Sequence, residues 1–206
     1  MKKTLLLWLV SLFAAAASAG AADDLRSLQE KMAASRVSFA YSYEAVRGSV
    51  VLKGSGTVVM QGRAFRMEGN GMEVVSDGKV RWTADAGARE LYIEAVSETQ
   101  PDFVSNPARL LAESDKVFRR EKTERTSFRG RAADGYVLVP AENTGLRRLV
   151  LFFSEGTLIG AAVTSGDGTV TEFAITDLAF SAPGTAEEFR YDEKSLDNSW
   201  LVTDLR

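Results

Sequence analysis

Apolar and polar residues alternate with a period of two along most of the segment from Val37 to Val96. This period is typical of β-strands that have one buried face. Turn sequences such as Ser76-Asp77-Gly78 and Asp85-Ala86-Gly87 interrupt the alternation at short intervals. The segment therefore predicts six successive strands joined by short loops, and strands joined in this way pair antiparallel.

The alternation also predicts which side chains share a face of the sheet. In the strand from Val37 to Tyr43, aromatic residues fall on one face, and serine and alanine fall on the other. Two glycines in the strand from Val50 to Met60, Gly54 and Gly56, indicate a bend, a bulge or a close approach of another group. We predict one apolar face, with Lys, Arg, Glu and Ser on the opposite face. The apolar face carries Phe39, Tyr41, Tyr43, Val58, Met60, Phe65, Met67, Val74, Val80, Trp82, Leu91 and Ile93.

A helical spacing precedes the strands. Leu25, Leu28 and Met32 recur at intervals of three and four, which predicts an amphipathic helix from Asp23 to Ala34. Its apolar stripe has two interpretations. It packs on the core of the domain, or it covers a cavity that binds lipid.

The chain after residue 100 predicts a short helix and then more strands. Asn106-Pro107 suits a helix start, so we expect a helix from Ala108 to Glu113. The segment from Lys116 to Arg131 is mostly basic and predicts an exposed strand pair, which is either a solvated edge or a surface for an acidic partner. Four further strands and a capped helical turn are predicted at Gly135–Pro140, Leu146–Ser154, Thr157–Thr164, Thr169–Phe180 and Thr185–Phe189.

An antiparallel sheet with one apolar face needs a second layer, which is another sheet, a closed barrel or a cover of helices. The chain supplies few helices and has no linker or break in composition. We therefore predict a mainly β (α+β) fold in a single domain, residues 20–206, with a curved sheet and helices on its inner side. The sequence does not distinguish a filled core from an apolar cavity in that position.

The first residues have the features of a secretory signal peptide. Met1-Lys2-Lys3 is a short positive start, Thr4 to Ala17 is mostly apolar, and Ala17-Ser18-Ala19 fits a cleavage site. The apolar run is shorter than the roughly 20 residues of a spanning helix, which disfavours a membrane anchor. We expect residues 1–19 to be removed, with cleavage after Ala21 as the second choice.

Composition excludes several kinds of chemistry. The 206 residues contain no cysteine and no histidine, and the formal net charge is -3. Disulfides, thiolate catalysis, N-terminal lipidation at cysteine and a Ser-His-Asp triad are therefore impossible. The slightly acidic balance does not favour nucleic acid, which requires a basic surface. We expect no cofactor and no metal.

Several phrases, taken in order, resemble one family. After the N-terminal segment and the helix come SFAYSYEAV (38–46), GSGTVVMQGRAFRME (54–68), VVSDGKVRWTADAGARELYIE (74–94) and NPARLLAE (106–113). This order resembles the LolA family of periplasmic carriers of outer-membrane lipoproteins, and VSDGKVRW is its most specific piece. The resemblance covers residues 23 to 115 and, more loosely, the strands to residue 191.

The resemblance implies an unclosed β-barrel, or half-barrel, whose helices lid an apolar cavity. Acylated lipoproteins would be the cargo, received from an inner-membrane ABC-type lipoprotein-releasing complex and delivered to an outer-membrane acceptor. The protein would be a non-enzymatic chaperone of the periplasm, and we expect a monomer. A Phe65→Glu change is expected to block loading while the fold survives. The implied cavity residues are the apolar-face residues named above together with Leu110, Leu111, Phe173 and Ile175.

The sequence also departs from the family pattern. The turn after the second strand usually contains Arg-Pro, whose arginine bonds the lid, whereas Gln61-Gly62 stands here and Arg63 follows. Met67 replaces a common aromatic residue, and Ala84 replaces a tyrosine. Because of these departures, the sequence does not decide whether the arginine latch exists. They also support a second hypothesis, a module that binds or senses another lipid or a glycolipid. A carboxylate-based hydrolase is a third hypothesis, but no converging pair of acids stands out.

Overall fold

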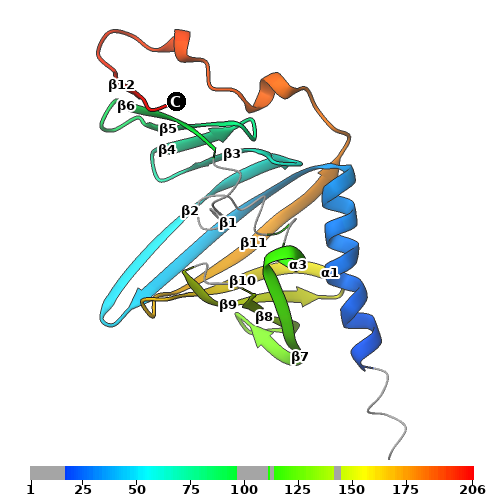
Figure 1. The fold of residues 1–206 in the computed structure, drawn as a ribbon. Coiled ribbons are helices and arrows are strands. Elements are labelled where there is room, and N and C mark those ends of the chain that lie inside the picture. Colours follow the sequence, from blue (N-terminus) through cyan, green and yellow to red (C-terminus); the bar gives the residue numbers. More distant parts are fainter. Residues whose placement is uncertain (1–16, 97–110, 112–113, 142–144) are drawn as a thin grey trace, which may run out of the picture.

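One twelve-stranded sheet forms the body of the protein in the computed structural model, which describes residues 17–96, 111, 114–141 and 145–206 (Figure 1). The described helices and strands are α1 (Ala17–Ala34), β1 (Arg36–Arg47), β2 (Val50–Gln61), β3 (Ala64–Gly69), β4 (Met72–Ser76), β5 (Val80–Asp85), β6 (Glu90–Ala95), α3 (Ser114–Val117), β7 (Phe118–Phe128), β8 (Arg131–Pro140), β9 (Leu146–Ser154), β10 (Thr157–Ser165), β11 (Val170–Ser181), the 3-10 helices η1 (Ala186–Phe189) and η2 (Glu193–Ser195), and β12 (Leu201–Asp204). The strand order is β12-β6-β5-β4-β3-β2-β1-β11-β10-β9-β8-β7. β7 and β12 form the two edges, so the predicted unclosed sheet is confirmed.

Two meanders make up this sheet. β1 to β6 pair in sequence order, as do β7 to β11, and the two sets join where β1 pairs antiparallel with β11. The last strand differs from the antiparallel prediction, because β12 pairs in parallel with β6. Figure 1 shows the reason: after β11 the chain passes along the β3–β6 end of the sheet before it joins the β6 edge.

The Ser76-Asp77-Gly78 sequence builds the turn between β4 and β5. Asp77 Oδ1 accepts hydrogen bonds from the backbone N–H groups of Lys79 and Val80, both at 2.8 Å. The buried Ser76 hydroxyl donates to the Val80 carbonyl at 3.0 Å and accepts from the Gly78 N–H at 3.1 Å. Gly78 has a φ of +88°, a conformation that favours glycine. The Ser-Asp-Gly residues of VSDGKVRW, the most specific piece of the family resemblance, therefore form the turn between β4 and β5.

Gly54 and Gly56 permit a close approach, which was one of three predicted reasons for them. The register of β1 and β2 places Gly54 opposite Tyr43 and Gly56 opposite Tyr41. A Cβ atom on Gly54 would lie 2.5 Å from the Tyr43 ring, and one on Gly56 would lie 2.8 Å from the Tyr41 hydroxyl oxygen. Side chains on β2 at these positions would displace both rings.

The predicted strand pair within Lys116–Arg131 is wrong. The segment contains one edge strand, β7, and its partner β8 begins only at Arg131. The turn consists of Arg129 and Gly130, both with positive φ, which is the backbone of a two-residue hairpin turn. One Gly in a run of charged residues was too weak a signal to place that turn.

The remaining helical predictions have mixed outcomes. α1 contains the predicted helix Asp23–Ala34 and begins earlier, at Ala17. The turn predicted at Thr185–Phe189 is confirmed as η1, where the Thr185 N–H donates to Glu188 Oε1 at 3.1 Å. The helix predicted at Ala108–Glu113 lies outside the described residues except for Leu111, and residues 1–16 of the predicted signal peptide lie outside them too.

Candidate binding surface

Two apolar clusters lie on opposite faces of the sheet. Adjacent residues of β4 separate them: Val74 packs with the cluster that contains Phe65, and Val75 belongs to the cluster that contains Trp82. The strand register agrees, because Met67 pairs with Val74 whereas Val75 pairs with Trp82. We name the first the inner cluster, on the face that α1 covers, and the second the outer cluster.

The prediction of a single apolar face is therefore wrong for four residues. Val80, Trp82, Leu91 and Ile93 belong to the outer cluster or pack against it. Alternation fixes which residues share a face within one strand, but it does not fix the phase between strands. Because β4 carries two adjacent valines, either valine side chain could have faced inward. The register with β5 places Val75 opposite Trp82, on the outer face.

The inner cluster joins the helices to both meanders. Its contributors from α1 are Leu25, Leu28 and Met32, and all three side chains are buried. The predicted site residues in this cluster or packed against it are Phe39, Tyr41, Val58, Met60, Phe65, Met67, Val74, Leu111, Phe173 and Ile175. Leu110 lies outside the described residues.

The second meander supplies inner-cluster residues that the prediction missed, namely Tyr136, Leu138, Leu146, Leu149, Leu151, Phe153, Leu158, Ala161 and Val163. Their strands were predicted, but β8 and β9 carry apolar residues on both faces, as in Gly135–Pro140 and Leu146–Ser154. A strand that is apolar on both faces gives no alternation from which to choose the inner residues.

A strip of aromatic rings extends the inner face toward the β1–β2 hairpin. Tyr41 and Tyr43 stack with ring centroids 6.5 Å apart, and Phe173 of β11 lies 6.4 Å from Tyr41 and 6.0 Å from Tyr43. All three side chains are half-buried, unlike the fully covered residues beneath α1. Burial and the neighbouring Tyr43 raise the pKa of Tyr41. These rings form an apolar surface beside the helix-covered region.

A hydrogen bond joins the two described helices of the cover. Gln29 Nε2 of α1 donates to the Ser114 hydroxyl of α3 at 3.0 Å, and this hydroxyl donates to the Leu111 carbonyl at 3.3 Å. Ser114 is fully buried, so the joint lies inside the cover. Arg26 and Glu30 form an exposed ion pair within α1 itself. The described contacts of α1 with the sheet include its apolar stripe and Lys31, whose ammonium lies 5.9 Å from the Phe180 ring centroid of β11.

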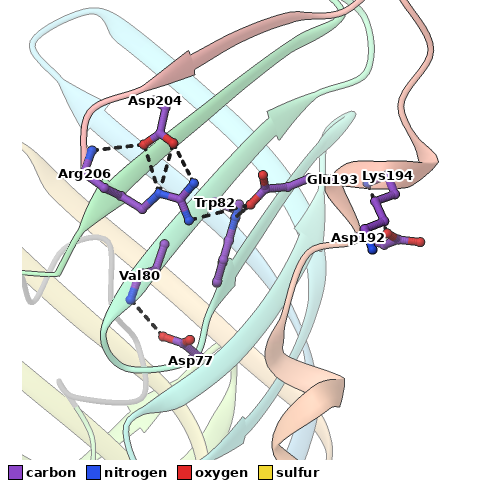
Figure 2. A network of polar contacts seen from close by, with 8 residues as sticks. All are labelled: Asp77, Val80, Trp82, Asp192, Glu193, Lys194, Asp204 and Arg206. Atoms are coloured by element: carbon purple, nitrogen blue, oxygen red, sulfur yellow. Dashed lines mark hydrogen bonds and ion pairs between the residues drawn. The ribbon is translucent and has the colours of Figure 1, made fainter.

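The outer cluster is covered by the chain after β11. Tyr191, Leu196 and Trp200 of this segment pack against it. Figure 2 shows the polar side of the contact, where Trp82 Nε1 donates to Glu193 Oε1 at 2.8 Å. Arg206 lies 3.8 Å from the same carboxylate oxygen and also pairs with Asp204, whose pKa it lowers to about 2.

Gln61 stands where the resemblance implied an arginine latch, and it bonds the segment that covers the outer cluster. The Gln61 side chain accepts from the Gly184 N–H at 2.8 Å and donates to the Gly184 carbonyl at 3.3 Å. Arg66 pairs with Glu73 and donates to the backbone carbonyls of Glu188 and Arg190 at 3.1 and 3.2 Å. Gln61 therefore anchors the C-terminal segment.

Tyr136 of β8 is the polar exception in the inner cluster. Its side chain is fully buried, and its hydroxyl has no hydrogen-bond partner in the described part of the chain. Burial first, and then the Asp24 carboxylate of α1, raise the pKa of Tyr136 to about 12. The Tyr136 ring packs edge-on against the Phe153 ring, with 4.9 Å between the ring centroids. The Arg120 guanidinium lies 5.4 Å from the centroid of the Tyr136 ring.

The architecture defines a class of protein: an open antiparallel sheet whose inner apolar face is covered by an amphipathic helix. A model of the outer membrane lipoprotein carrier protein LolA family matches residues 30–192, most of the 206 residues. The chain therefore belongs to the LolA family, whose members are periplasmic. Its fold is a lipid-binding fold. No curated protein matches the chain significantly.

Several solved structures are similar to this chain at low sequence identity. An uncharacterised conserved protein from Thermus thermophilus is 13% identical with a TM-score of 0.54, and the match covers 90% of this chain and 99% of that one. A DUF1329 family protein from Desulfovibrio piger is 12% identical, covering 86% and 98% of the chains, with a TM-score of 0.44. A LolA superfamily protein from Nitrosomonas europaea is 11% identical, covering 82% and 98%, also with a TM-score of 0.44.

Proposed function

We propose that this protein is a periplasmic carrier that binds the acyl chains of outer-membrane lipoproteins beneath α1. In this proposal the inner cluster is the closed form of the binding site. The acyl chains would take the place of the apolar stripe of α1 on the sheet. No covalent step is involved, and the protein acts as a transport chaperone.

The observation that carries the proposal is the way in which α1 is attached. Leu25, Leu28 and Met32 are each no more than 6% exposed, and the described polar joint of α1 to another helix is the Gln29–Ser114 hydrogen bond. An apolar contact of this kind has no directional preference, so methylene groups can replace leucine and methionine side chains.

Magnitudes support such an exchange. Exposing three buried aliphatic side chains costs roughly 5 to 9 kcal/mol, at about 1.5 to 3 kcal/mol each. Burying an acyl chain gains about 0.8 kcal/mol per methylene, so about ten methylenes offset the loss. Loading and release would then differ little in free energy, which suits a carrier that must deliver its cargo.

Export and partners complete the proposal. Residues 1–19 would direct secretion and be removed, which N-terminal sequencing of the periplasmic protein tests. An inner-membrane ABC-type complex would supply lipoproteins, and an outer-membrane acceptor would receive them. No helix within the described residues is long and apolar enough to cross a membrane.

The test is mass spectrometry of whatever remains bound to protein purified from the periplasm. Acylated lipoprotein is the expected result. Free phospholipid or glycolipid would replace the carrier role with the alternative, a lipid-binding or lipid-sensing module. Protein that is empty and takes up no hydrophobic probe would overturn both.

Phe65→Glu is a poor probe of loading, contrary to the sequence-based expectation. Phe65 is 1% exposed, so a carboxylate there would be buried in the core without a partner and would unfold the protein. Phe173→Ser is better, because Phe173 is half-buried on the same face. We expect weaker binding of acylated peptides by a protein that remains folded.

A further inference from the structure

The Tyr136 hydroxyl of β8 is buried in the closed protein. It lies in the inner cluster, where the hydroxyl has no hydrogen-bond partner among the described residues. Asp24 and the Leu25 backbone, both in α1, are near enough to influence its pKa, although the Leu25 amide does not meet hydrogen-bond geometry. The hydroxyl therefore lies at the seam between β8 and α1, where the proposed exchange takes place.

An unpartnered buried hydroxyl destabilises the closed state, because it has lost its hydrogen bonds to water without replacement. A phenylalanine would fill the same space without this loss. The ring is also held in place, edge-on to Phe153 and beneath the guanidinium of Arg120. A fixed donor that lacks an acceptor in one state is suited to an acceptor that arrives in another state.

We propose that the Tyr136 hydroxyl donates a hydrogen bond to an acyl carbonyl oxygen of the bound lipid, at the ester or amide that joins the acyl chain to its head group. This inference rests on the proposed acyl-chain binding. When α1 moves away with Asp24 and Leu25, the carbonyl would take the position beside the hydroxyl that these residues occupied, and the acyl chain would continue over the inner cluster.

The surroundings favour a neutral acceptor over an anionic one. Burial is the largest cause of the raised pKa of Tyr136, so the apolar side chains around the hydroxyl disfavour negative charge there. With a pKa of about 12, the group keeps its proton at all physiological pH values and remains a donor. A phosphate would bring negative charge into this apolar cluster at a large cost, whereas an uncharged carbonyl would not.

Three synthetic ligands with the same chain length test the proposal by titration calorimetry. They are a diacylglyceryl-cysteine peptide with ester links, its dialkyl ether analogue, and an N-acyl peptide with one amide link. We expect Tyr136→Phe to weaken binding of the ester ligand, the amide ligand or both by roughly three- to tenfold, the loss that one hydrogen bond represents. Binding of the ether analogue should not change. The arm that loses affinity identifies the carbonyl as ester or amide.

The other outcomes are informative too. Equal losses for ester, amide and ether ligands, or no loss for any, would overturn the inference and leave Tyr136 a packing residue. If the unaltered protein binds none of the three ligands, the proposed function itself fails. Tyr92→Phe is the matched control, since Tyr92 is exposed and its hydroxyl bonds Glu90. A denaturation curve for Tyr136→Phe verifies that the variant is folded.

Discussion

The inner and outer clusters are both apolar, but their covers are attached in different ways. The outer cover is the C-terminal segment, which is held by Gln61, Arg66 and the Trp82–Glu193 hydrogen bond, and which ends in the β12–β6 pairing. The inner cover is α1, whose described contacts include an apolar stripe, a hydrogen bond to α3 and the Lys31 ammonium over the Phe180 ring. Many directional bonds specify one arrangement, whereas apolar contact accepts substitutes. The difference indicates that the outer cover is permanent and the inner cover is exchangeable.

The largest expected effect comes from emptying the outer cluster. Trp82→Ala should destabilise the protein by about 3 to 5 kcal/mol, because it removes a buried indole and its hydrogen bond to Glu193. Urea denaturation measures this loss. The folded fraction should bind acylated peptides with unchanged affinity, and a loss of binding there would break the division between the clusters.

Releasing the outer cover should have the next largest effect. Arg66→Ala removes the donor to two backbone carbonyls and the partner of Glu73, at a cost of about 1 to 3 kcal/mol. Limited proteolysis should then cut faster between residues 182 and 200. Arg190→Ala is the matched control, since Arg190 is exposed and contributes its backbone carbonyl to the contact. Equal cutting of the two variants would contradict the anchoring role.

Loosening the inner cover should affect binding more than stability. Gln29→Ala breaks the hydrogen bond to Ser114 at a cost of about 1 kcal/mol. Uptake of a fluorescent acylated peptide should become several times faster, as measured by stopped flow. Arg26→Ala, on the exposed side of the same helix, should leave the rate of uptake unchanged. Unchanged uptake by Gln29→Ala would mean that α1 does not limit entry.

A further effect concerns Tyr136 and appears only at high pH. Its pKa is about 12 in the folded protein, above the ordinary value of 10, so the folded state holds the proton longer than the unfolded chain does. This difference in proton affinity adds a term to the free energy of unfolding that is complete below pH 10 and is lost as pH rises toward 12. Tyr136→Phe should therefore lose less stability over this range in urea titrations. Parallel curves for the two proteins would count against an uncharged, buried phenol.

The comparison also separates what alternation reveals from what it does not. Within the first meander it correctly placed Phe65 with Met67 and Val80 with Trp82 on shared faces, and antiparallel neighbours followed from the short loops, whereas the unclosed sheet was implied by the resemblance to the LolA family. It could not place these pairs on the same or opposite faces, because Val74 and Val75 leave the phase of β4 undecided. That information lies in the register with β5, which is a long-range property of the sheet.

The second meander shows a different limit. Tyr136 and Leu151 lie in strands that are apolar on both faces, and nothing local marks the inner side. The C-terminal cover was equally hidden, because Gln61 and Gly184 are 123 residues apart in the chain. Trp200-Leu201-Val202 was the visible signal, an apolar group in a polar tail.

The central claim, that α1 leaves the sheet when cargo binds, has a direct test in a protein without cysteine. A Cβ atom at Gly156 would lie 3.4 Å from Asp24 Oδ1, so Asp24→Cys with Gly156→Cys allows a disulfide that ties α1 to the β9–β10 turn. Binding of an acylated peptide is compared in the oxidised and reduced forms. Any strain at Gly156 is common to both. We expect the reduced form to bind and the oxidised form not to bind. Equal binding by the two forms would contradict the claim.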